Sequence, residues 1–181
     1  MRRAVRFLVS ILSGLPFTSL AERAHAVSLL LLGFLRAMID GPTPLHLIEK
    51  PAPGTGATLM VDAIATILTG SGASVMTEAS DDEEWRKRVT AKLRQIPALL
   101  LIDNIHHKLD SSALAAALTA PFWEDRILGV SEMTRLPTAA SGSPRVTTRN
   151  SRTRWPGGLC AFGSIRMKSV PGSAQGSAIP T

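Results

Sequence analysis

Cysteine and aromatic residues are scarce in this sequence of 181 residues. The single cysteine, Cys160, excludes an intramolecular disulfide framework and a cysteine-rich zinc site. Tyrosine is absent and aromatic residues make up only 4% of the chain, so we do not expect single strands to be bound by base stacking on aromatic platforms. The most apolar stretch, residues 27–39, contains Arg36 and falls well short of the roughly 20 residues of a membrane span.

Acidic residues are absent from the last quarter of the chain. Residues 137–181 hold six Lys and Arg, whereas residues 1–136 hold 14 basic and 14 acidic residues, so the net charge of +6 belongs to the C-terminal segment. Gly, Ser and Pro account for 18 of those 45 residues. We therefore expect residues 138–181 to form a disordered basic tail, because burial cannot offset the entropy lost on ordering it.

The N-terminus partly matches a secretion signal, with basic residues followed by an apolar stretch. Gly14 and Pro16 interrupt that stretch, and the chain that follows has an intracellular pattern. We predict a cytoplasmic protein with an N-terminal helical segment, residues 1–44, and no membrane segment. An exported protein is the alternative, and only the N-terminus favours it.

Residues 45–137 alternate between short apolar runs and helical spacing, which predicts an α/β fold with a parallel sheet. We expect Ser80 with Glu83 and then Asp110 to cap two of the helices, a turn at residues 121–123, and Trp85 and Trp123 to be core or interface anchors. The predicted strands are residues 45–48, 74–78 and 98–103, and the predicted helices are residues 58–68, 82–95 and 111–118.

A loop rich in Gly and Pro follows the first predicted strand. Gly54 and Gly56 can adopt backbone conformations closed to other residues, and consecutive N–H groups before a helix can cradle phosphates. Thr58 stands where such a loop places a hydroxyl for magnesium. The predicted nucleotide contacts from this loop are Pro53, Gly54, Thr55, Gly56, Ala57 and Thr58.

The other half of the predicted site is the acidic end of the apolar run at residues 98–103, which is typical of a strand buried on both faces. Asp103 would bind Mg²⁺ together with Thr58, and Asn104 follows it. The order and separation of the two halves predict ATP and Mg²⁺ as ligands. The simpler alternative is that both segments are ordinary turns next to strands.

Two positions depart from the phosphate-loop pattern G-x-x-x-x-G-K-[ST]. Pro51 replaces the first glycine, and Ala57 replaces the lysine that neutralises the β- and γ-phosphates. Lys50 is close enough in sequence to be considered in its place. In addition, Asn104 stands where many ATPases have a glutamate that polarises water. These departures predict weak ATP binding and no efficient hydrolysis, and we assign no catalytic residue.

Several motifs in order carry a family resemblance. The motifs are residues 16–19 (PFTS), 21–25 (AERAH), 41–45 (GPTPL), 53–56 (PGTG), 75–78 (VMTE), 82–88 (DEEWRKR) and 101–104 (LIDN). With them, the segment from about residue 15 to 137 resembles the AAA+-type P-loop ATPase core of phage- and mobile-element-encoded, primase–helicase-like replication proteins. This resemblance implies a P-loop NTPase-like three-layer parallel sheet, a role in DNA replication, and a homo-oligomer or replication proteins as partners.

The resemblance further implies a strand ending in a polar sensor residue, and then an arginine that reaches a neighbour's nucleotide, after residue 137. We expect neither in the tail. Regrouped codon bases permit Gly-Asn-Asn-Pro-Glu across residues 145–150, Met-Ala-Arg-Arg across 154–158 and Val-Arg-Ile-Arg-Leu-Asp across 159–165. We therefore hypothesise that the reading frame slipped just after Pro137, leaving an incomplete core, and the DNA sequence tests this.

These patterns together predict the remnant of an ATP-binding module from a mobile-element DNA replication protein. The alternative function is a non-enzymatic scaffold or interaction domain of a DNA-replication assembly.

Overall fold

The computed structural model describes residues 2–39, 41, 43–52, 54–106, 109–127, 129, 132–138, 145–150 and 161–168. The helices are α1 (Arg2–Ile11), α2 (Leu20–Leu35), the 3-10 turn η1 (Arg36–Met38), α3 (Ala57–Thr69), α4 (Asp82–Arg94) and α5 (Ser112–Thr119). The strands are β1 (Leu45–Lys50), β2 (Ser74–Thr77), β3 (Leu100–Ile105), β4 (Phe122–Arg126), β5 (Met133–Pro137), β6 (Arg145–Asn150) and β7 (Ala161–Arg166).

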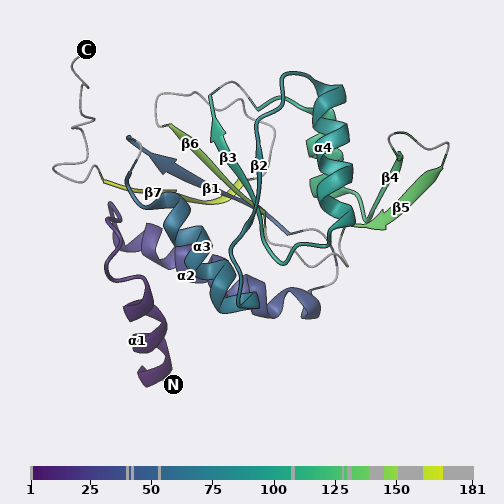
Figure 1. The fold of residues 1–181 in the computed structure, drawn as a ribbon. Coiled ribbons are helices and arrows are strands. Elements are labelled where there is room, and N and C mark those ends of the chain that lie inside the picture. Colours follow the sequence, from purple (N-terminus) through teal and green to yellow (C-terminus); the bar gives the residue numbers. More distant parts are fainter. Residues whose placement is uncertain are drawn as a thin grey trace, which may run out of the picture.

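Five of the strands form a parallel sheet in the order β2-β3-β6-β1-β7 (Figure 1). Strands β4 and β5 pair separately as an antiparallel hairpin that projects beyond α4 (Figure 1). The chain is therefore a mixed α/β protein, as its alternating pattern predicted. None of the helices in the described ranges combines the length and apolar character needed to cross a bilayer.

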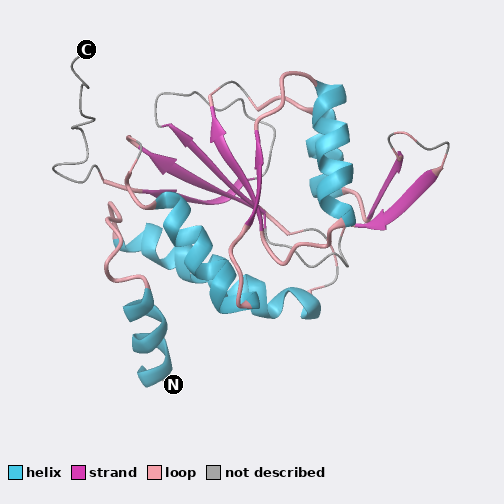
Figure 2. Ribbon diagram, viewed as in Figure 1, coloured by secondary structure: helices cyan, strands magenta, loops and turns pink. Residues whose placement is uncertain are grey.

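Helices cover both faces of the parallel sheet (Figure 2). Strand β3 shows the reason, because its neighbouring residues alternate between the two sides. Leu101 packs in a buried cluster with α2 and α3, whereas Leu100 and Ile102 pack in a second cluster with α4 and α5. Burial on both sides explains why this strand is a continuous apolar run.

The prediction of a disordered tail is wrong for residues 145–150 and 161–166, which form β6 and β7. Ile165 and Met167 are buried in the cluster with α2 and α3, and the Arg166 Nε lies 2.6 Å from the Glu49 Oε2. The prediction from composition failed because β6 and β7 both pair with β1, which supplies partners for their backbone hydrogen bonds. Strands paired in this way need few apolar residues of their own. The rest of the predicted tail lies outside the described residues, apart from Thr138, Met167 and Lys168.

Two helix caps differ by one residue from those predicted. Asp81, not Ser80, caps α4, because its Oδ1 accepts a hydrogen bond from the Glu84 N–H at 2.8 Å. Ser111, not Asp110, caps α5 through its Oγ and the Leu114 N–H at 3.1 Å. Several adjacent residues in each segment are good caps, and packing of the helix selects among them.

The predicted turn at residues 121–123 is instead the start of the β4–β5 hairpin. Trp123 anchors this hairpin, since it is only 4% exposed and its Nε1 donates to the Thr90 Oγ1 on α4 at 2.8 Å. Trp85 is buried in the same cluster. The prediction that both tryptophans are anchors is confirmed.

Asp82 links the start of α4 to the start of α5. Its carboxylate accepts hydrogen bonds from the Ser111 and Ser112 hydroxyls, both at 2.6 Å, and from the Ala113 N–H at 3.2 Å. These bonds favour the charged form, the Ser111 bond most strongly, and lower the pKa of Asp82 from 3.8 to about 2.

We expect Asp82→Asn to lower the melting temperature at pH 7. Because the pKa of Asp82 is lowered in the folded state, its stabilisation is present above about pH 4 and is lost as the pH falls toward 2. The difference in melting temperature between variant and wild type should therefore shrink over that range, as followed by circular dichroism. Glu132→Gln, which changes an exposed carboxylate, is the control. A difference that is the same at pH 7 and pH 2 would show that the charge contributes nothing.

Candidate functional site

The loop between β1 and α3 has the backbone form that its glycines predicted. Gly54 and Gly56 have φ angles of 82° and 84°, in the left-handed region that side chains disfavour. Gly56 is also the N-cap of α3, and its carbonyl accepts the first helical bond, from the Met60 N–H at 2.9 Å. Pro53, which we also predicted to contact the nucleotide, lies outside the described residues.

Helix α3 begins without a side-chain cap. In contrast, backbone N–H groups in the first turns of α2, α4 and α5 donate hydrogen bonds to the side chains of Ser19, Asp81 and Ser111. The first N–H groups of a helix have no partner within the helix and carry the positive end of its dipole. Among these four helices, α3 is therefore the one whose first N–H groups have no side chain bound to them. An anion could bind to these N–H groups.

Three other predicted loop residues have distinct environments. Thr55 is 2% exposed, and among the described residues its Oγ1 has no hydrogen-bond partner. Ala57, at the position where the pattern has lysine, is buried in the apolar cluster with α2 and α3. Thr58 lies half-buried in the first turn of α3. The first turn of α3 thus carries no charged side chain of its own.

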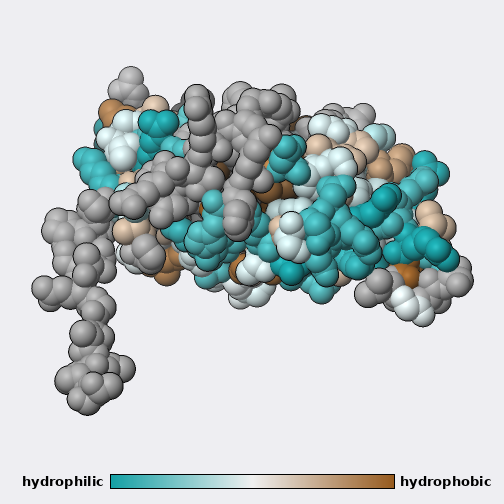
Figure 3. Space-filling view, turned by 90° about the horizontal axis from the view of Figure 1, so that it is seen from above, coloured by the Kyte–Doolittle hydropathy of each residue, from teal (hydrophilic) through white to brown (hydrophobic). Residues whose placement is uncertain are grey.

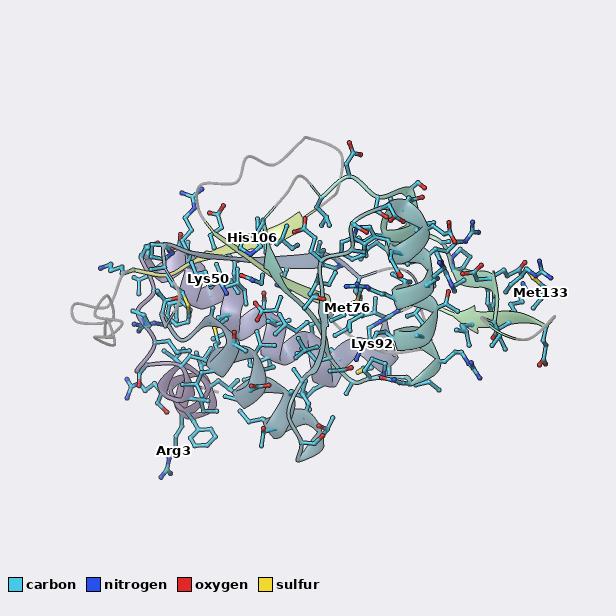
Figure 4. The ribbon with its side chains drawn as sticks, turned by 45° about the horizontal axis from the view of Figure 1, so that its top comes forward. Arg3, Lys50, Met76, Lys92, His106 and Met133 are labelled. Carbon is cyan, nitrogen blue, oxygen red and sulfur yellow. The ribbon has the colours of Figure 1, made fainter. Side chains whose placement is uncertain are left out.

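A positive charge reaches this edge from the end of β1 instead. The Lys50 Nζ lies 3.4 Å from the Asp103 Oδ1 on β3, and the two side chains are 15% and 25% exposed. Strand β6 lies between β1 and β3, so the Lys50 side chain spans one strand to reach the carboxylate. Lys50, at the end of β1, and His106, which directly follows β3, are labelled in Figure 4 and mark the ends of these two strands. The ion pair joins two residues that the sequence singled out separately.

Asn104 lies within β3 and not in a turn after it. The strand continues to Ile105, and its register with β6 shifts between Ile102 and Ile105. The φ angle of Asn104 is 63°, a left-handed value that asparagine tolerates better than most residues. The irregularity falls directly after Asp103, at the point where the carboxylate is presented.

Strand β6, between β1 and β3, was not predicted from the sequence. We expected no strand ending in a polar residue after residue 137, but β6 ends at Asn150, which pairs in register with Lys50. The signal that could have indicated it is the β-branched run of residues 146–148 (VTT). The basic, glycine-rich flanks of that run outweighed it in our prediction.

The donor set suits a metal ion that arrives with a phosphate ligand. The described residues contain no group of three or more His, Cys, Asp or Glu side chains placed to hold a metal. Mg²⁺ commonly binds proteins through one or two carboxylates and takes its other ligands from phosphate and water. Asp103 and the Thr58 hydroxyl, on β3 and in the first turn of α3, are oxygen donors of the kinds that this pattern uses.

A hollow of about 290 Å³ lies between α4 and β4, away from the loop after β1. The surface over α4 and the hairpin is mainly hydrophilic (Figure 3). Arg86 pairs there with Asp125 at 3.2 Å, and Lys87 pairs with Glu83 at 2.9 Å. The charges within these two pairs neutralise one another, and Arg94 and Arg126 also line the hollow. We do not assign the hollow a ligand.

No protein-family model matches this chain, and a search of curated proteins finds no match.

Proposed function

We propose that this chain is a P-loop-type ATP-binding domain, the remnant of an ATPase module from a mobile-element DNA replication protein. It binds Mg-ATP weakly and does not hydrolyse it efficiently. The observation that carries the proposal is the glycine loop between β1 and the uncapped start of α3, beside the Lys50–Asp103 ion pair.

The direction of the chain connections supports a ligand at this edge. Helix α3, after β1, packs on one face of the sheet, whereas α4 and α5, after β2 and β3, pack on the other. In open α/β sheets, ligands bind outside the carboxyl ends of strands where the connections diverge in this way. Here the helix that follows β1 and the helix that follows β3 lie on opposite faces, and β6 is the strand between β1 and β3.

The chemistry available at the loop supports binding more than hydrolysis. Backbone N–H groups and one ammonium can hold phosphates. The first turn of α3 lacks a charged side chain because Ala57 replaces the lysine, and Asn104 cannot act as a general base. A bound triphosphate would thus be held without the groups that usually stabilise charge during its transfer.

Titration calorimetry of the full chain with Mg-ATP tests the proposal. We expect saturable binding with a dissociation constant on the order of 0.1–1 mM. Asp103→Ala should weaken it at least about tenfold, because the carboxylate that would hold the metal is removed. Glu132→Ala should bind like the wild type, since that carboxylate is exposed beyond β4.

The alternative function gives a different result in the same titration. A folded chain that takes up no Mg-ATP at millimolar concentration would rule out the ATP-binding proposal. It would support a non-enzymatic scaffold or interaction domain within a DNA-replication assembly.

A further inference from the structure

We infer that Lys50, at the end of β1, supplies the phosphate counter-charge that Ala57 cannot supply, and that Asp103 holds its ammonium group in place until a nucleoside triphosphate binds. This inference rests on the proposed function and assigns a positioning and binding role to a residue outside the loop pattern.

The start of α3 offers no place for a cation of its own. Ala57 is 3% exposed and packs among the apolar side chains of α2 and α3, and the first turn of α3 has neither acidic nor basic residues. Lys50 precedes the loop directly and is mostly buried. A positive charge near the start of α3 is therefore supplied by Lys50 at the end of β1 and not by a side chain of α3.

The Lys50 side chain reaches across β6 toward Asp103. Its ammonium lies 3.4 Å from a carboxylate two strands away, which holds it over the carboxyl edge of the sheet and out of bulk solvent. The Thr55 hydroxyl, in the loop itself, is buried and has no hydrogen-bond partner among the described residues. A buried polar atom of this kind is uncommon and calls for a ligand or strain to explain it.

Binding of Mg-ATP would give Lys50 and Asp103 new partners in place of one another. In the free protein the Asp103 carboxylate neutralises the Lys50 ammonium. When Mg-ATP binds, Asp103 would hold the metal and Lys50 would turn to the phosphate oxygens, to which a lysine ammonium binds as a compact point charge. Asp103 thus competes with phosphate for Lys50 when magnesium is absent and assists binding when magnesium is present.

The exchange predicts that one substitution acts in opposite directions with and without magnesium. Calorimetric titration of the full chain with ATP in EDTA should show that Asp103→Asn binds several-fold more tightly than the wild type, because its Lys50 is no longer neutralised. With Mg²⁺ the same variant should bind more weakly than the wild type. A gain without magnesium is not the result of a damaged fold, since loss of structure weakens binding in both conditions.

Removing the ammonium tests Lys50 directly. Lys50→Met and Lys50→Gln should weaken Mg-ATP binding about 10- to 100-fold, as expected for a charged hydrogen bond, and Lys50→Arg should keep most of the affinity. AMP binding should change less, because it lacks the outer phosphates. Lys87→Met is the matched control, since Lys87 is more exposed and pairs with Glu83 on α4.

The outcomes distinguish failure of the proposed ATP binding from failure of the proposed role of Lys50. If the folded wild type binds no Mg-ATP, both are wrong. If the wild type binds and Asp103→Ala loses binding, but Lys50→Met and Lys50→Gln bind within about twofold of the wild type, only the role of Lys50 is wrong. If Asp103→Asn gains no affinity in EDTA, the exchange of partners is wrong.

Discussion

Replacing Ile64 with alanine should destabilise the protein by about 2–5 kcal/mol. Ile64 is fully buried on α3, in the cluster that joins α2 and α3 to the sheet. Loss of three side-chain carbons there removes burial and leaves a cavity that rigid neighbours cannot fill. Since domains are typically stable by only 5–15 kcal/mol, this one change removes a large share of the total. Urea unfolding followed by tryptophan fluorescence measures it.

Ile67→Ala is the matched control for this prediction. Ile67 lies one turn further along α3 and is 42% exposed, so the same chemical change should cost less than about 1 kcal/mol. Both substitutions alter helix propensity equally, and the difference between them reports burial alone. Equal effects at the two positions would contradict the packing of α3 against the sheet.

Acid should destabilise the protein through His46. This side chain on β1 is 2% exposed, and neither ring nitrogen has a hydrogen-bond partner among the described residues. Burial, and to a smaller extent the charge of His25, lowers the pKa of His46 from 6.5 to about 4. The unfolded chain therefore binds more protons than the folded chain between these values, and stability falls as the pH is lowered through that range.

The expected loss from this histidine is about 3 kcal/mol between pH 7 and pH 4. His46→Leu should flatten the dependence over this range, because leucine fills a similar volume and does not titrate. His25→Gln should leave most of the pH dependence of stability, since burial lowers the pKa of His46 more than His25 does. Urea unfolding at pH 4, 5, 6 and 7 measures all three proteins. A wild type equally stable at pH 7 and pH 4, after subtraction of the Asp82→Asn contribution, would contradict the burial of His46.

The sequence by itself determined the elements whose signal is local. The spacing of apolar residues predicted α3, and the capping signal at residues 80–83 predicted α4, each to within about one residue of its observed ends. The continuous apolar run predicted β3 as a strand buried on both faces. The glycines of the loop after β1 also have the left-handed backbone that their positions suggested. Each of these features depends on neighbouring residues, and a short stretch of chain contains the whole reason for it.

Only the tertiary structure decided the features that join distant segments. Strands β6 and β7 come from a segment whose composition predicted disorder, and they are strands because β1 supplies their hydrogen bonds. The Lys50–Asp103 pair joins residues 53 positions apart, and the Glu49–Arg166 pair joins residues 117 positions apart. Sheet order brings such side chains together, and no local periodicity carries that order. The loop and the proximity of Lys50 to it were therefore predictable from sequence, whereas the pairing of Lys50 with Asp103 depends on the arrangement of the strands.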